Sequence, residues 1–190
     1  VLTVLAGSLA AYSFERFDAT FLPNLYLTTR MIPPVVMIIP TYLGAYLLGI
    51  LDTYFLLIFL YSALNMALIA WLLRDFFSKI PRELEEAAMI DGCTRLQSLR
   101  KVILPLVRPG LIASGLICFI FTWNEFIFAL TLTGDRTRTL PVLVSTFITQ
   151  RGMDRGLMAA ASIIASIPII LVTMFFSRHL ISGLTKGSTK

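Results

Sequence analysis

Charged residues are scarce in this sequence of 190 residues. Asp, Glu, Lys and Arg together make up 14% of it, whereas soluble domains contain about 25%. Hydrophobic residues make up 57%, against about 45–50% in soluble domains, and the mean hydropathy is +0.83. A soluble chain of this length still exposes roughly a third of the surface that its unfolded form exposes. The composition therefore excludes an ordinary soluble domain and indicates a protein that folds in a lipid bilayer.

Residues that perform catalysis or bind metals are also few. The one histidine, His179, follows Arg178 at a predicted helix end, where basic side chains complement the helix dipole. The two cysteines, Cys93 and Cys118, are expected at different depths, so we predict no disulfide between them. The C-terminal segment GLTKGSTK lacks the G-x-x-x-x-G-K spacing of a phosphate-binding loop, and no strand precedes it. We predict no catalytic residue, no metal site and no cofactor bound by this chain.

Long uncharged segments dominate the chain. A helix needs about 20 apolar residues to cross a bilayer core of about 30 Å. Four segments reach this length, namely Met31–Leu51, Tyr54–Leu73, Gly110–Thr131 and Gly156–Ser177. Val1–Phe14 is too short to cross alone, begins without a methionine and has no signal-peptide features, so we interpret it as the end of a truncated helix. The pattern predicts one all-α polytopic membrane domain over residues 1–190, with about five spans present and an N-terminal helix missing.

The basic residues are distributed unevenly between the joints that connect these spans. With strict alternation, Glu15–Arg30, Arg74–Arg108 and the tail 178–190 lie on one side and carry twelve Lys and Arg residues. The short turn at Asp52 and the loop 133–155 lie on the other side and carry four. Because cytoplasmic loops are enriched in Lys and Arg, the first group is predicted to be cytoplasmic, and 133–155 is predicted to be an outer loop.

Residues 78–109 form the one charge-rich hairpin between apolar spans. Pro81 suits the first turn of a helix, for which Ser78 is the expected cap. Leu84, Ala87, Ala88 and Asp91 are expected to share one shallow helix face, and Gly92 supplies the left-handed residue that ends the helix. Two interpretations follow from the residues alone: an amphipathic loop that lies on lipid headgroups, or an element that docks on a partner.

A second helix is predicted in the same hairpin. Thr94 and Gln97 have the spacing of a capping box. Leu96 and Leu99 begin an apolar stripe that continues through Val102–Ile103. Pro105 and Pro109 are expected to stop or bend the helix just before the next span.

The hairpin also carries a family motif. The order Glu86-Ala87-Ala88, three residues, Gly92, nine residues, Val102, one residue and Leu104-Pro105 resembles the EAA loop of ABC-type importer permeases, with Val102 in place of the usual isoleucine. A chance match has a probability of roughly one in ten million per starting position. LMAAASIIASIPII, RHLISGLTKGSTK and WNEF are similar to segments of the smaller membrane subunit in carbohydrate importers of the maltose type.

The resemblance implies a type I ABC importer transmembrane subunit with six helices in its complete form. Such a permease performs no chemistry and works with a second permease, a pair of ATPase subunits that bind ATP-Mg, and an extracytoplasmic solute-binding protein. It implies a bacterial or archaeal inner membrane and a sugar substrate. The expected ATPase-coupling residues are Glu86, Ala87, Ala88, Asp91, Gly92, Leu104 and Pro105. The alternatives are a permease for a non-sugar solute and an ion-coupled transporter, which would need several intramembrane ionisable groups.

Glu125 is the one acidic residue inside a predicted span. A carboxylate near the bilayer centre costs about 2.5–3.5 kcal/mol on insertion scales, so it should face protein or water. One interpretation places Trp123, Asn124, Glu125 and Asn65 on the substrate path or its outer gate. The other makes them interhelical packing contacts or interface residues. The outer loop 133–155 is either a contact for the binding protein or a solvated connection.

Overall fold

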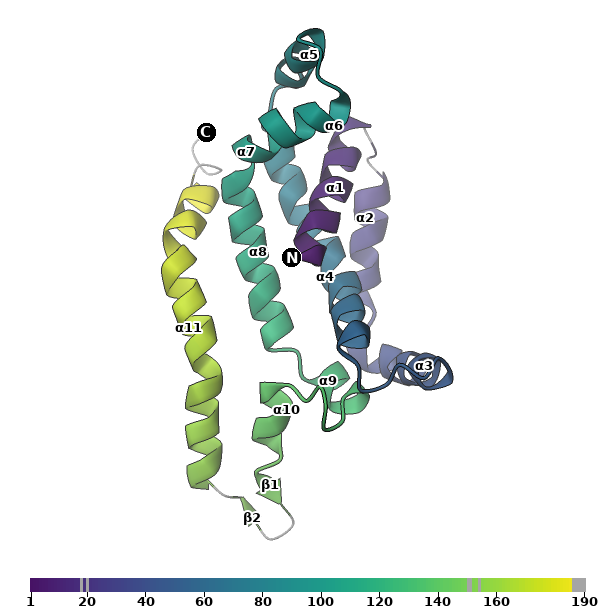
Figure 1. The fold of residues 1–190 in the computed structure, drawn as a ribbon, viewed down its shortest axis with the longest axis vertical. Helices are drawn as coiled ribbons and strands as arrows, with labels where there is room; N and C mark the ends of the chain where they lie inside the picture. The colour runs from purple at the N-terminus through teal and green to yellow at the C-terminus, as the bar shows by residue number, and fades with distance from the viewer. Residues whose placement is uncertain (18, 20, 150–151, 154, 186–190) are drawn as a thin grey trace.

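The structure, a computed structural model, describes residues 1–17, 19, 21–149, 152–153 and 155–185. Long helices run side by side, and short elements lie at both ends (Figure 1). The first elements are α1 (Leu2–Arg16), α2 (Phe21–Thr28), the 3₁₀ turn η1 (Thr29–Met31), α3 (Pro34–Leu47), α4 (Tyr54–Phe77), α5 (Arg82–Ile90), α6 (Arg95–Ser98) and the π-helical turn η2 (Leu99–Ile103). The others are α7 (Leu104–Leu106), α8 (Arg108–Trp123), α9 (Ile127–Leu132), α10 (Leu140–Ser145), β1 (Ile148–Thr149), β2 (Gly152–Met153) and α11 (Arg155–Thr185).

The bundle is built from α1, α2, α4, α8 and α11. Helix α1 packs along α4, α4 packs on α8, and α8 packs on α11. Elements α5, α6, η2 and α7 form the hairpin at one end of the bundle, which we call the hairpin end (Figure 1). Elements α9 and α10 and the short β1–β2 ladder lie at the opposite end, called the far end. Helix α11 runs from the far end back to the hairpin end.

Two of the described helices are long and apolar enough to cross a bilayer on their own: α4, and Arg155–Phe176 within α11. Two helix pairs reach the necessary length only across a sharp bend, which measures 89° between Asn24–Met31 and Pro34–Leu47 and 77° between Arg95–Leu106 and Arg108–Trp123. The described residues therefore contain two to four candidate spans by length and composition. The helical fold class is confirmed, and the count of five spans stays a prediction.

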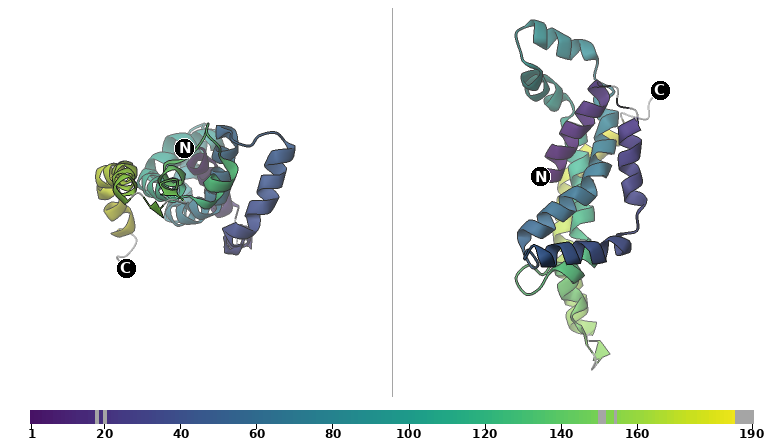
Figure 2. Two further views of the ribbon diagram at one scale, coloured as in Figure 1. Left: turned by 90° about the horizontal axis from the view of Figure 1, so that it is seen from below. Right: turned by 90° about the vertical axis from the view of Figure 1, so that its right-hand side faces the viewer.

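The expected span Met31–Leu51 is not one continuous helix. Ile32 and Pro33 are extended, with ψ angles of 120° and 131°, and α3 begins only at Pro34. Residues before prolines avoid the helical conformation, so the consecutive prolines enforce the break. Helix α3 then lies across the far end of the bundle (Figure 2). The assignment of Arg30 to a cytoplasmic joint was wrong, because α2 and η1 already pack along α4.

The expected span Gly110–Thr131 is also interrupted. Helix α8 ends at Trp123, and α9 begins at Ile127 after a short irregular segment. Hydropathy did not predict this interruption, because the residues on both sides of it are apolar. Tyr54–Leu73 and Gly156–Ser177 lie inside the continuous helices α4 and α11, as expected.

Two hydrophobic clusters hold the two ends. The cluster at the hairpin end joins α1, α4, η2 and α8 through buried residues that include Ile69, Leu73, Phe77, Ile103 and Val107. The cluster at the far end joins α3, α4 and α9 through Ala45, Leu56, Leu57, Tyr61, Phe128 and Leu132. The hairpin is thus packed on the bundle by its own apolar side chains, as a short amphipathic element requires for stability.

Candidate functional site

The first helix of the hairpin is delimited as its sequence predicts, with one exception. Pro81 is the N-cap of α5, and Gly92 follows its last turn with φ of +88°, a conformation that favours glycine. The amide of Cys93 donates to the Ala88 carbonyl at 3.0 Å, which closes the turn. Ser78 does not cap α5, because it ends α4 and its Oγ donates to the Asp75 carbonyl at 3.1 Å.

The second helix begins with the expected capping box. The amide of Gln97 donates to Thr94 Oγ1 at 3.3 Å, and the Thr94 amide donates to Gln97 Oε1 at 2.8 Å. The helix then widens into the π turn η2, in which the Leu104 amide donates to the Leu99 carbonyl. Such turns are rare and occur often at functional sites. The bend of 77° before α8 falls between Pro105 and Pro109, as expected.

The apolar stripe of the second helix divides between the bundle and the surface. Leu99 and Ile103 are buried in the cluster at the hairpin end, and Val102 and Leu104 pack against it. Leu96 lies outside this cluster and is 70% exposed. The expected apolar stripe is therefore buried against the bundle only from Leu99 onward, and Leu96 lies on the exposed part of the hairpin.

A buried ion pair joins the hairpin to α1. Nε of Arg16 lies 2.7 Å from Oε2 of Glu85, and both side chains are 5% exposed. Tyr12, one turn earlier in α1, donates its hydroxyl to the other carboxylate oxygen of Glu85. Both partners of Glu85 belong to α1, so these contacts join α5 directly to that helix.

A second set of polar contacts surrounds this ion pair. Arg82 donates from Nη2 to the Glu15 carbonyl at 3.1 Å, and Nε of Arg74 lies 3.5 Å from the Glu15 carboxylate. A polar cavity of about 120 Å³ lies beside these contacts, lined by Arg16, Arg82, Glu85, Glu86, Met89 and Arg95. The base of the hairpin is therefore held by charges from α1, α4 and α5.

The outer surface of α5 differs from the expected docking face. Glu86, Ala87 and Asp91 are exposed, but Ala88 is only 8% exposed and faces the rest of the hairpin. The shared face of two alanines was therefore wrong. Ile90 takes the place of Ala88 on the accessible surface and is 86% exposed. This surface of acidic and apolar residues is free to contact a partner.

Trp123 and Asn124 close the last turn of α8. Trp123 donates its indole N–H to the Ala165 carbonyl of α11 at 3.0 Å, which links two long helices. Asn124 donates from Nδ2 to the Ile120 carbonyl of its own helix at 2.8 Å. Both polar groups thus have protein partners in this structure.

Glu125 holds three hydrogen bonds at the interruption between α8 and α9. Its carboxylate accepts from the amides of Phe128 and Ala129 at 2.9 and 3.1 Å, and so caps the first turn of α9. It also accepts from the hydroxyl of Tyr61 in α4 at 2.8 Å. The interhelical interpretation of Glu125 is therefore confirmed, whereas a role on the substrate path stays a prediction.

Asn65 lies near the middle of α4 and is 6% exposed. Its Nδ2 donates to the Tyr61 carbonyl at 2.9 Å and to Thr122 Oγ1 of α8 at 3.4 Å. Its Oδ1 accepts from Arg30 Nη2 at 3.0 Å. Asn65 thus connects η1, α4 and α8, and it is linked through the backbone of Tyr61 to the Glu125 contact.

Comparison with known families decides the class of the protein. The model of the family described as "Binding-protein-dependent transport system inner membrane component" matches residues 3–186. The chain belongs to this family. Its members are transport components, and the resemblance of the hairpin to the EAA loop of importer permeases is thereby confirmed.

Relatives with assigned names are permease proteins. The chain is 39% identical to the trehalose/maltose transport system permease protein MalG of Thermococcus litoralis, over 99% of this chain and 69% of that protein. It is 35% identical to the trehalose transport system permease protein SugB of Mycobacterium tuberculosis, over 100% of this chain and 72% of that protein. It is 36% identical to the diacetylchitobiose uptake system permease protein DasC of Streptomyces coelicolor, over 87% and 60% of the two chains.

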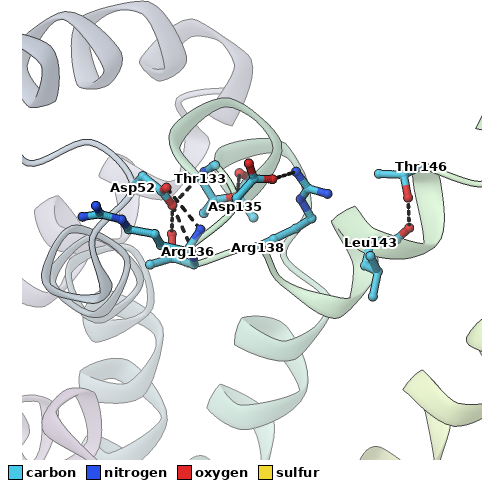
Figure 3. Close-up of polar contacts among 10 residues, drawn as sticks. Asp52, Thr133, Asp135, Arg136, Arg138, Leu143 and Thr146 are labelled. Atoms are coloured by element: carbon cyan, nitrogen blue, oxygen red, sulfur yellow. Dashed lines mark hydrogen bonds and ion pairs between the residues drawn. The ribbon is translucent and has the colours of Figure 1, made fainter.

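In this binding-protein-dependent transport component, Asp52 fastens the turn before α4 to the loop after α9 (Figure 3). Its carboxylate accepts hydrogen bonds from the amides of Gly134, Arg136 and Thr137 and from the Thr137 hydroxyl, at 2.7–3.2 Å. These hydrogen bonds lower the pKa of Asp52 from its ordinary value to about 2, and the largest contribution comes from the Thr137 hydroxyl. We call this arrangement the Asp52 clasp.

Sequence reasoning missed both Glu85 and Asp52 as key positions of this transport component. Glu85 stands among three acidic residues of one helix start, and the EAA motif selects only Glu86. Asp52 had one usable signal: it lies between two apolar helices in the short segment Gly49–Thr53, where an acidic residue favours a turn. Its φ of +53° confirms a left-handed conformation, which aspartate tolerates better than most residues.

Proposed function

We propose that the chain is the membrane-spanning permease subunit of an ATP-driven sugar uptake system that depends on a binding protein. The single observation that supports coupling is the hairpin. Its inner side is fixed to α1 through Glu85 and Arg16, and its outer side presents Glu86, Ala87 and Ile90 to a partner. A sugar substrate is supported by the relatives named for trehalose, maltose and diacetylchitobiose.

The partners follow from this assignment. A pair of ABC ATPase subunits carries ATP-Mg and receives the exposed side of α5, including Asp91 and Gly92. A second permease completes the path, and an extracytoplasmic solute-binding protein delivers the sugar. The hairpin and the C-terminus lie in the cytoplasm of a bacterium or archaeon, and loop 133–155 faces outward. Leu104 and Pro105 support the hairpin where it returns to the membrane.

The far end of the bundle is proposed as the outer side of the substrate path. Trp123 and Glu125 tie α8 to α11 and α4, while Asn124 closes the last turn of α8. These bonds fix the helix ends that border the path. Nearer the middle of α4, Asn65 donates a further hydrogen bond to Thr122 of α8.

The experiment is affinity purification of the tagged full-length protein from native membranes. The amount of ATPase that copurifies is compared between wild type and two charge-reversal variants. Glu86→Lys reverses an exposed charge on α5, and Arg136→Glu reverses an exposed charge at the far end. We expect Glu86→Lys, like Gly92→Asp, to insert normally but to lose the ATPase and uptake. Arg136→Glu keeps the ATPase.

Substrate class is measured by uptake of labelled trehalose, maltose and proline into proteoliposomes that hold the whole system. Uptake of a sugar but not of proline is the expected result. Retention of the ATPase by Glu86→Lys would contradict the docking assignment, and uptake of proline alone would contradict the sugar assignment.

A further inference from the structure

Arg30 occupies an unusual position at the middle of the bundle. It belongs to η1, and its Nη2 donates to Oδ1 of Asn65 at 3.0 Å. Asn65 lies near the middle of the 24-residue helix α4, which is long and apolar enough to cross a bilayer core. With α4 as a membrane span, the guanidinium is expected near the depth of the membrane centre and not among the charges of the loops.

The charge of Arg30 has few partners. The guanidinium lies over the ring of Phe121 at 5.7 Å from its centroid, and Phe121 is itself 53% exposed. Within the part of the chain that the structure describes, no carboxylate pairs with Arg30, and the bond to Asn65 uses one of its five N–H donors. A cation at this depth is costly unless it faces protein or water, so the exposed side of Arg30 borders a polar path or a partner.

The bend after Arg30 adds a hydrogen-bond acceptor beside these donors. Pro34 has no N–H, so it cannot donate to the carbonyl four residues earlier, at Arg30, whereas the Thr29 carbonyl is bonded within the 3₁₀ turn η1. The chain turns by 89° at this point. Broken helices at membrane depth occur where the freed carbonyl groups line a cavity or are satisfied by other groups.

We infer that Arg30 and Phe121 form a sugar-contacting subsite midway along the transport path, with Asn65 holding the guanidinium in place. A sugar presents neighbouring hydroxyl groups, which accept from the two forks of a guanidinium and donate to carbonyls. It also presents an apolar C–H face, which packs against an exposed aromatic ring. The inference rests on the proposed function, because the chemistry of the subsite is argued for a sugar.

The test uses the complete importer with full-length protein in proteoliposomes, and labelled trehalose and maltose as probes. In Arg30→Gln, uptake falls at least about tenfold, since hydrogen bonds to a charged group are stronger than neutral ones. Stimulation of the ATPase by the sugar-loaded binding protein is unchanged. Thr28→Val is the matched control, because the Thr28 hydroxyl bonds only to the Leu25 carbonyl of its own helix, and its uptake stays at the wild-type level.

A second measurement leaves Arg30 in place. In a protein with Cys93 and Cys118 replaced by serine, Thr29→Cys, which is exposed beside Arg30 in η1 and keeps both Arg30 and Phe121, is labelled with a water-soluble thiol reagent during turnover. Trehalose or maltose is expected to protect this cysteine, whereas proline does not. Protection supports the subsite even where the Arg30 variant fails to assemble.

The outcomes separate the two proposals. Wild-type uptake of proline but of neither sugar overturns the proposed function and the subsite with it. Wild-type sugar uptake with an unchanged Arg30→Gln variant, or without protection of the cysteine at position 29, overturns the subsite alone. Loss of the second permease from purified Arg30→Gln, together with no protection of the cysteine by sugar, makes Arg30 an interface residue paired with that subunit and also overturns the subsite.

Discussion

Arg16 of α1 and Glu85 of α5 form a buried ion pair, although they are 69 positions apart in the chain; Nε and Oε2 lie 2.7 Å apart. The hairpin is therefore fastened to a helix that is distant in sequence, in addition to α4 and α8, which directly precede and follow it. In this importer permease, the ion pair gives α5 a direct contact with α1 besides its packing on α6 and η2.

Removal of the Glu85 carboxylate is the first test of this link. Glu85→Ala leaves the Arg16 charge buried without its partner, which costs about 3–5 kcal/mol. We expect a lower midpoint of thermal unfolding in detergent and a loss of uptake. Glu83→Ala removes an acidic residue that is exposed in the same first turn, and should stay within about 0.5 kcal/mol of wild type. Equal unfolding midpoints for the two variants would show that the ion pair does not hold the hairpin.

Gly92 offers a test of backbone conformation without steric conflict. A Cβ at Gly92 would meet no atom within 4 Å, but its φ of +88° is unfavourable for alanine. Gly92→Ala should therefore destabilise the hairpin by about 1–2 kcal/mol and reduce uptake. Gly44→Ala is the control, because its Cβ also meets nothing within 4 Å and it lies inside α3. Gly44→Ala should leave uptake unchanged, and a similar loss in both variants would refute the conformational argument.

Substitution of alanine for each of two glycines in α8 is expected to affect stability differently. A Cβ at Gly110 would lie 2.4 Å from the ring of Phe76, whereas one at Gly115 would make an ordinary contact of 3.6 Å with Val4. Gly110→Ala should cost about 1–3 kcal/mol through overpacking, and Gly115→Ala should be tolerated. The measurement is thermal unfolding of each variant in the same detergent. A Gly115→Ala variant as unstable as Gly110→Ala would place the close helix contact elsewhere.

The Asp52 clasp predicts a specific pH dependence. The pKa of Asp52 in the folded protein is about 2, below its ordinary value of 3.8. The clasp therefore adds stability at pH values above 3.8, and this contribution is lost as the pH falls through about 2. Proteolysis of loop 133–155 should be faster in Asp52→Asn than in wild type near neutral pH.

Hydrogen exchange of the same loop, which also works in acid, should show the two proteins converging between pH 4 and pH 2. Gly134→Ala provides an independent variant, because its Cβ would lie 2.7 Å from Oδ2 of Asp52. It should open the loop at neutral pH while leaving the carboxylate in place. A loop that is equally protected in all three proteins would exclude the clasp.

Features encoded by a few neighbouring residues were predicted from the sequence. The capping box of Thr94 and Gln97, the left-handed Gly92 and the bend between Pro105 and Pro109 each depend on local backbone chemistry. The EAA motif also lies within one segment, and family membership confirmed the class that it implies.

Features that depend on distant partners were not predicted. The sequence shows three similar acidic residues at the start of α5, and only the position of α1 decides that Glu85 becomes buried. The hydropathy pattern predicted that Arg30 lies in a loop, because a charged residue just before an apolar segment normally marks the start of a membrane span. The structure instead places Arg30 inside a bent helix pair, where Asn65 accepts its hydrogen bond.

The contact between Trp123 and Ala165 also has a use in the laboratory. The sequence contains two tryptophans, and the other one, Trp71, is 42% exposed on α4. Trp71→Phe would leave a single indole, whose N–H is bonded to a carbonyl of α11. Its fluorescence emission depends on that hydrogen bond and on the polarity around the ring, so it would shift whenever α8 and α11 separate. The chain thus contains an intrinsic optical reporter of helix movement that needs no attached dye.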